Sequence, residues 1–137
     1  MGRHEQREQL FKLLFRVEFN TPDEMPEQVK LFFQDDEIEY TEKVMEAIQK
    51  KYESINEKLP EIDKLLNEKA DGWSTERMGK VELTVLRIAV YEMIFDEDIP
   101  ETVAINEAIE IAKQYGQSAS GGFVNAVLAK FVNKQEM

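Results

Sequence analysis

The sequence predicts an all-α protein, and three observations indicate this fold class. Apolar residues recur three and four positions apart over most of the 137 residues, a spacing that places them on one face of a helix. Proline, glycine and helix-capping residues divide the chain into about seven such stretches. No alternation of apolar and polar residues lasts long enough to indicate a strand. We therefore expect about seven helices in two packed helical subdomains, roughly residues 1–58 and 59–137 of a single domain.

The first half of the chain supplies three of the predicted helices. We expect them at about residues 5–19, from Pro26 onward and at about 41–56. Proline suits the first turn of a helix because the backbone N–H groups there have no acceptor within the helix, so the N–H that proline lacks is not needed. Apolar side chains at helical spacing give each helix a core face: Leu10, Leu13, Leu14 and Val17; Val29, Phe32 and Phe33; Val44, Ala47, Ile48 and Ile55.

The second half supplies four more predicted helices. They begin near Pro60, at Arg77, after Pro100 and after residues 120–122. The helix expected at about 77–95 leaves almost no polar side, which is typical of a buried central helix. The core faces of the other three are Ile62, Leu65 and Leu66; Ile105, Ala108, Ile109 and Ala112; Val124, Val127, Leu128 and Phe131.

The charge of the chain limits how it could bind a polyanion. A net charge of −11 and an isoelectric point near 4.6 oppose binding to a phosphate polymer unless the contact is local. Residues 1–20 carry four basic and three acidic side chains, a net charge of +1 that leaves −12 for residues 21–137. The amino-terminal end is therefore the only relatively basic part.

Several protein classes are excluded by what the sequence lacks. The absence of cysteine excludes disulfides, thiolate zinc sites and cysteine nucleophiles. No apolar run approaches the roughly 20 residues that span a bilayer, and residues 1–8 lack the apolar core of a signal peptide. We therefore expect a cytoplasmic protein that makes no membrane contact.

Two short motifs resemble ligand sites, but each lacks a residue that the site needs. A calcium-loop spacing has Tyr40 where glycine is required; its other members are Asp35, Glu37, Glu39, Thr41 and Glu46. Residues 116–121 have the glycine spacing of a phosphate-binding loop, but Gly122 stands where lysine is required. The only histidine, His4, lies near the terminus. We therefore expect no enzyme, no metal site and no cofactor.

The Ser/Gly turn before the last predicted helix keeps one functional interpretation. Its backbone N–H groups would favour an anion at the start of that helix. A plain helix-to-helix turn is the alternative interpretation of the same residues.

An ordered set of segments runs through the last two thirds of the chain. The segments are WSTER at 73–77, VLRIAVYE at 85–92, DIP at 98–100, VAINEA at 103–108, IAK at 111–113, YG at 115–116 and FVNAVL at 123–128. With the Arg-x-x-x-Arg-Glu start at Arg3 and the pattern LFxxEF at 14–19, the chain resembles the NusB family of bacterial transcription antitermination factors over essentially its full length. The resemblance implies an all-α fold of two helical subdomains.

The resemblance also implies a function. Family members bind the boxA sequence of ribosomal RNA leader transcripts as a heterodimer with a small-subunit ribosomal protein, also called NusE. The pair contributes to an antitermination complex that lets RNA polymerase pass terminators. Neither a cofactor nor a reaction is implied.

The resemblance places RNA contacts in two regions and a protein contact in a third. The RNA-contacting residues it implies are Arg3 and Arg7 at the start of the chain, and Ser118, Ser120, Gly121, Gly122, Phe123 and Asn125 around the turn. Two arginines one turn apart can present guanidinium groups to phosphates, and Phe123 can stack on an unpaired base or pack in the core. Glu82 aligns with an acidic position that contacts the basic ribosomal partner, and a solvated surface glutamate is the alternative.

Two other functions stay open at this stage. One is a helical adaptor that binds only proteins. The other is an RNA-targeting domain related to that of ribosomal RNA cytosine methyltransferases, although the chain ends without the glycine-rich loop of a cofactor-binding domain. The oligomeric state also stays open, because the family includes monomers and homodimers.

Overall fold

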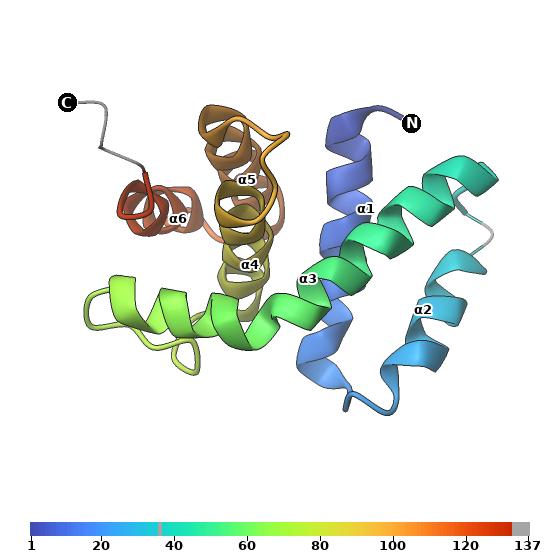
Figure 1. Ribbon diagram of the computed structural model, residues 1–137, viewed down its shortest axis with the longest axis horizontal. Coiled ribbons are helices and arrows are strands. Elements are labelled where there is room, and N and C mark those ends of the chain that lie inside the picture. The colour runs from blue at the N-terminus through green and yellow to red at the C-terminus, as the bar shows by residue number, and fades with distance from the viewer. Residues whose placement is uncertain (36, 133–137) are drawn as a thin grey trace. The chain divides into compact units, whose positions relative to one another are not determined.

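The computed structural model describes residues 1–35 and 37–132. All regular secondary structure in these residues is helical. The elements are α1 (Arg3–Phe15), the 3₁₀ turn η1 (Arg16–Phe19), α2 (Met25–Phe33), α3 (Glu42–Lys69), α4 (Lys80–Ile94), α5 (Glu101–Tyr115) and α6 (Ser120–Ala129) (Figure 1). The described residues contain no strand, so the predicted all-α class is confirmed. No helix among them is long and apolar enough to cross a membrane.

The number of helices differs from the prediction at Pro60. The helices expected at about 41–56 and from Pro60 onward are one continuous helix, α3, and the described part of the chain has six α-helices rather than about seven. Proline inside a helix removes one backbone hydrogen bond and costs about 3 kcal/mol. The buried residues of α3 nevertheless recur at helical spacing on both sides of it: Ile48, Tyr52, Ile55, Ile62 and Leu66. Their burial offsets the lost bond.

The chain divides into two compact units, Met1–Glu57 and Lys58–Met137, and the division falls within α3. In the first unit, Arg16 fastens η1 to α2. Its Nη1 atom donates hydrogen bonds to the backbone oxygen of Gln28 at 3.2 Å and to Gln28 Oε1 at 3.1 Å. Its guanidinium also lies 5.2 Å from the centre of the Phe32 ring. This arginine is therefore part of the internal structure of the unit.

In the second unit, the helices α4, α5 and α6 pack against one another. As predicted, α4 is buried almost all round, from Leu83 to Val90. Arg87 of α4 forms a two-bond salt bridge with Asp63 of α3, Nε to Oδ1 at 2.9 Å and Nη2 to Oδ2 at 2.8 Å. This pair fixes α4 to the last turns of α3.

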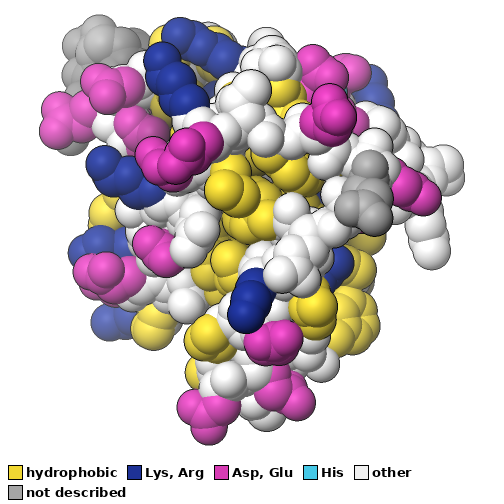
Figure 2. Space-filling view, turned by 90° about the vertical axis from the view of Figure 1, so that its right-hand side faces the viewer, with side chains coloured by type: hydrophobic (Ala, Val, Ile, Leu, Met, Phe, Trp, Pro, Cys, Tyr) yellow, Lys and Arg dark blue, Asp and Glu magenta, His cyan; other side chains and the backbone are white. Residues whose placement is uncertain are grey.

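The acidic character of the composition extends to the surface. The chain has 28 acidic and 17 basic residues. On the face shown in Figure 2, Asp and Glu side chains lie among apolar side chains and a smaller group of lysines and arginines. An RNA site on such a protein depends on local arrangement rather than on total charge.

Candidate nucleic-acid interface

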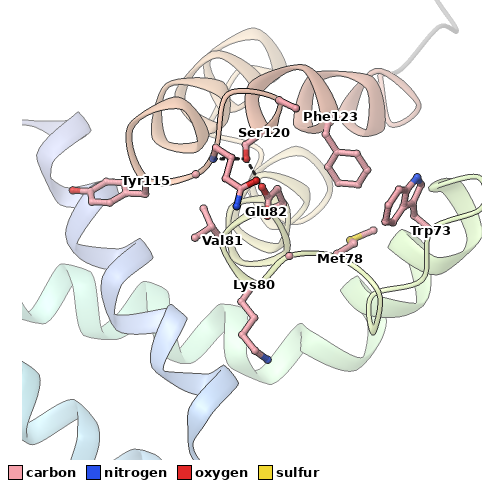
Figure 3. A pocket seen from close by; sticks show the side chains of 12 residues that line it. Trp73, Met78, Lys80, Val81, Glu82, Tyr115, Ser120 and Phe123 are labelled. Atoms are coloured by element: carbon pink, nitrogen blue, oxygen red, sulfur yellow. Dashed lines mark hydrogen bonds between the residues drawn. The ribbon is translucent and has the colours of Figure 1, made fainter.

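A pocket of about 700 Å³ lies in the second unit, where the start of α4 meets the turn between α5 and α6. Its lining residues come from the loop before α4, the first turn of α4, the α5–α6 turn and the first turn of α6: Trp73, Met78, Gly79, Lys80, Val81, Glu82, Tyr115, Gly116, Gln117, Ala119, Ser120 and Phe123 (Figure 3). Three of the residues proposed from the sequence, Glu82, Ser120 and Phe123, therefore surround one pocket.

Ser120 joins α6 to α4 through its hydroxyl group. The hydroxyl donates a hydrogen bond to Glu82 Oε2 and accepts one from the backbone N–H of Gln117 at 2.9 Å. The N–H of Ser120 donates in turn to the oxygen of Gln117 at 3.0 Å. Ser120 is only 3% exposed, and these bonds engage its hydroxyl as donor and as acceptor. Ser120 thus holds the turn in place.

Gly116 makes room for the Ser120 hydroxyl. A Cβ atom on Gly116 would lie 2.5 Å from Ser120 Oγ and 2.7 Å from the backbone oxygen of Ala112. The backbone of Gly116 is extended, so close approach rather than an unusual dihedral angle explains the glycine. The turn depends on this small residue.

The two glycines of α6 differ in their surroundings. A Cβ on Gly121 would lie 3.1 Å from Lys113 Cγ, so this buried glycine allows α6 to approach α5 closely. A Cβ on Gly122 would meet nothing within 4 Å. Both lie in the first turn of α6, where backbone N–H groups have no acceptor within the helix. Gly122 therefore leaves the start of the helix open to a ligand.

An aromatic pair lines the opposite part of the pocket. The rings of Trp73 and Phe123 lie edge to face, with centres 5.5 Å apart, and in Figure 3 they point toward each other with Met78 beside them. The Arg77 guanidinium lies 5.4 Å from the centre of the Trp73 ring, and Arg77 Nη1 donates to the Gly72 oxygen at 3.2 Å. Trp73 and Arg77 were not among the site residues proposed from the sequence. The only signal in the sequence that could have indicated them was a tryptophan four residues before an arginine in the WSTER segment at 73–77.

The other proposed RNA-contacting residues lie in both units and differ in their exposure. Around the turn, Ser118 and Asn125 are exposed. In the first unit, both arginines belong to α1; Arg3 is exposed, whereas Arg7 is only 8% exposed. Of these four proposed residues, Arg3, Ser118 and Asn125 are therefore accessible at the surface, whereas Arg7, like Ser120, has a mainly internal position.

The described residues contain no group of three His, Cys, Asp or Glu side chains placed to hold a metal ion. In the calcium-loop motif, the Glu37 N–H donates to Asp35 Oδ1 at 2.9 Å. This bond is typical of an Asx turn and satisfies part of the carboxylate locally.

The fold matches those of solved NusB structures. A structure of NusB from T. maritima superposes with a TM-score of 0.84 and 38% identity, covering 95% of this chain and 89% of that one. A chain in a crystal structure of antitermination factors NusB and NusE in complex with double-stranded RNA superposes with a TM-score of 0.79 and 25% identity, covering 94% and 96%. The fold class is therefore that of NusB-like helical proteins.

The sequence comparisons identify the family. Residues 4–133 match the model of the NusB family. The transcription antitermination protein NusB of Lachnoclostridium phytofermentans is 48% identical over 97% of this chain and 100% of that protein, and the one of Agathobacter rectalis is 49% identical over 96% and 99%. This chain belongs to the NusB family. Family membership confirms the predictions of an antitermination factor and of a protein that is not an enzyme.

Proposed function

We propose that this antitermination protein binds boxA RNA of ribosomal RNA leader transcripts together with the ribosomal protein NusE, as part of an RNA polymerase antitermination complex. The observation that carries the proposal is the likeness, over 94% of the chain, to a chain in a structure of NusB and NusE with double-stranded RNA. The proposal places the protein in the cytoplasm, where bacterial RNA is transcribed.

The α5–α6 turn supplies the RNA contacts of the second unit. Ser118 and Asn125 are exposed and can bond to phosphate or base edges, and the open start of α6 at Gly122 can receive a phosphate. Phe123, which is half-buried, can stack on an unpaired base. Ser120 and Gly121 act indirectly, because they hold the turn against Glu82 and Lys113.

The first unit contributes arginines. Arg3 is exposed and free of the core packing that surrounds the apolar face of α1, so its guanidinium can neutralise a phosphate. Arg7 lies one turn further along the same helix and is mostly buried. We propose that Arg3 makes the main charge contact and that Arg7 contributes a smaller one.

The acidic surface suits a basic protein partner. A chain of net charge −11 gains association rate and specificity by meeting a positively charged protein. Glu82 stays the proposed contact for that partner. The Oε2 atom of Glu82 already accepts a hydrogen bond from the Ser120 hydroxyl. Binding of the partner at Glu82 would therefore also affect the position of the turn that we propose binds RNA.

The test is RNA binding measured by fluorescence anisotropy with labelled boxA RNA, with and without NusE. A shuffled RNA of the same composition is the matched control. We expect selective binding of boxA RNA that is tighter when NusE is present. No selectivity in either mixture would refute the proposal, and binding of NusE without RNA selectivity would favour the protein-binding adaptor. Light scattering of the same mixtures gives the ratio of protein to RNA and detects a homodimer.

A further inference from the structure

We infer that Trp73 and Phe123 form a stacking site for one unpaired base of the bound RNA, with Arg77 placed beside it to pair with the adjoining phosphate. This inference rests on the proposed function and adds Trp73 and Arg77 to the residues that carry it. The aromatic pair joins two segments that lie 50 residues apart in the chain.

The exposure of Trp73 separates it from a core residue. Trp73 is 45% exposed, although Met78, five residues later in the same pocket, is buried. A tryptophan that served only as packing would gain free energy by burying its ring as Met78 does. Trp73 instead keeps nearly half of its surface at the opening of a pocket, where a planar apolar ligand can reach it.

The neighbouring groups fit a nucleotide. Aromatic side chains bind unpaired bases through their faces, and this stacking accepts every base. Arg77 is exposed, and its guanidinium lies at the Trp73 ring. An arginine there can stack on the ring and bond to a phosphate with the same planar group. Arg77 thus gives the apolar site the positive charge that a nucleotide requires.

The single acidic side chain that lines the pocket does not oppose this arrangement. Glu82 accepts the Ser120 hydroxyl, and in Figure 3 this pair lies on the side of the pocket away from Trp73. The aromatic pair and the Glu82–Ser120 pair therefore divide the pocket into an apolar half and a hydrogen-bonded half. The apolar half, continuous with the turn at Phe123, receives the base.

Binding of boxA RNA to the full chain with NusE tests the inference. Trp73→Ala should weaken binding about 5-fold to 20-fold, the lower part of the range for loss of one stacked base. Trp73→Phe should keep most of the affinity because a ring remains. Ile94→Ala, in the same unit and with a parent side chain that is 46% exposed, is the matched control and should bind like the parent. Thermal unfolding of each variant shows whether the fold is kept.

A second measurement separates stacking from a structural role. A series of RNAs, each with one abasic nucleotide at a different position, identifies the base that stacks on Trp73. At that position, we expect the abasic RNA and Trp73→Ala together to weaken binding no more than either change does alone. Trp73 is the only tryptophan of the chain, so the fluorescence difference between the parent and Trp73→Phe reports on this ring, and RNA should quench it. Independent losses at every position, or equal affinity of parent and Trp73→Ala, would overturn the inference while leaving the proposed function in place. Absence of RNA binding by the parent would remove both.

Discussion

The hydroxyl group of Ser120, at the first residue of α6, bonds directly to the carboxylate of Glu82 in the first turn of α4. The family resemblance implies different ligands for these residues, RNA for Ser120 and a protein for Glu82. The bond couples the two residues, because Ser120 holds the α5–α6 turn and is itself held by Glu82, the proposed contact for the protein partner. A substitution at either residue should therefore alter the position of the other.

Ser120→Ala should lower the free energy of unfolding by about 1–3 kcal/mol, because it removes a buried hydroxyl that serves as donor to Glu82 and acceptor from Gln117. Urea unfolding measures the change. Ser118→Ala, at an exposed position of the same turn, should stay within about 0.5 kcal/mol of the parent. Equal effects of the two substitutions would show that the buried hydroxyl does not hold the turn.

Gly116→Ala should destabilise the protein, whereas Gly122→Ala should not. The first places a methyl group 2.5 Å from Ser120 Oγ and 2.7 Å from a backbone oxygen, and overpacking of this kind costs about 1–3 kcal/mol. The second enters open space in α6 and should be neutral or stabilising by about 0.5 kcal/mol, because alanine favours the helix. The check is the difference in unfolding midpoint between the two variants. A destabilised Gly122→Ala would contradict the open surface assigned to the start of α6.

The sequence predicted the fold class because helical spacing is a local property. Leu10, Leu13 and Leu14 show it within one turn, and all three are buried. The prediction was wrong at Pro60. Proline usually interrupts a helix, so two helices were expected there, but burial of Ile62 and Leu66 keeps α3 continuous. A local rule gives the cost of proline but not the free energy of packing that opposes it.

The sequence could indicate only separate parts of the candidate site, for a related reason. The resemblance indicated Glu82, Ser120 and Phe123 singly, but their common pocket joins residues up to 41 positions apart. Trp73 entered the sequence analysis only as part of the WSTER segment at 73–77, because its pairing with Phe123 depends on tertiary structure. Helical spacing does place Arg7 on the core face of α1, since Leu10, Phe11 and Leu14 lie three, four and seven residues further on, but its predicted role was based on its charge rather than its position. Burial of Ser120 depends on its tertiary contact with Glu82.

Asp63→Ala should destabilise the second unit by removing the salt-bridge partner that binds Arg87 through two hydrogen bonds. The Arg87 side chain is 9% exposed, and it would keep its charge with fewer compensating contacts. Breaking a fully buried pair costs about 3–5 kcal/mol. Because Asp63 is partly exposed, we expect about 2–3 kcal/mol in urea unfolding. The surface pair of Lys58 and Glu61 gives the control, since Glu61→Ala should cost less than about 1 kcal/mol.

Tyr40 should make the first unit less stable at alkaline pH. Its hydroxyl donates to Gln9 Oε1 at 2.7 Å, and burial, with the nearby Asp35 charge, raises the pKa of Tyr40 above 10.0 despite the opposing effect of Arg16. The neutral phenol is thus favoured in the folded state, so its contribution is fully present below pH 10 and is lost as pH rises through the raised pKa. Unfolding measured from pH 9 upward should show a smaller loss of stability in Tyr40→Phe than in the parent. Identical pH profiles would contradict the shift.

Arg3→Ala should weaken boxA RNA binding and flatten its dependence on salt, because each phosphate contact releases counterions. Loss of one contact changes the slope of log affinity against log salt by about 0.7–0.9. Arg3 is exposed, so the free energy of unfolding should not change. Arg7→Ala should flatten the slope less and also reduce stability, since Arg7 is only 8% exposed. Lys43→Ala removes one exposed positive charge at the start of α3 and is the charge-matched control. If Lys43→Ala and Arg3→Ala flattened the slope equally, total charge rather than a contact at Arg3 would explain the salt dependence.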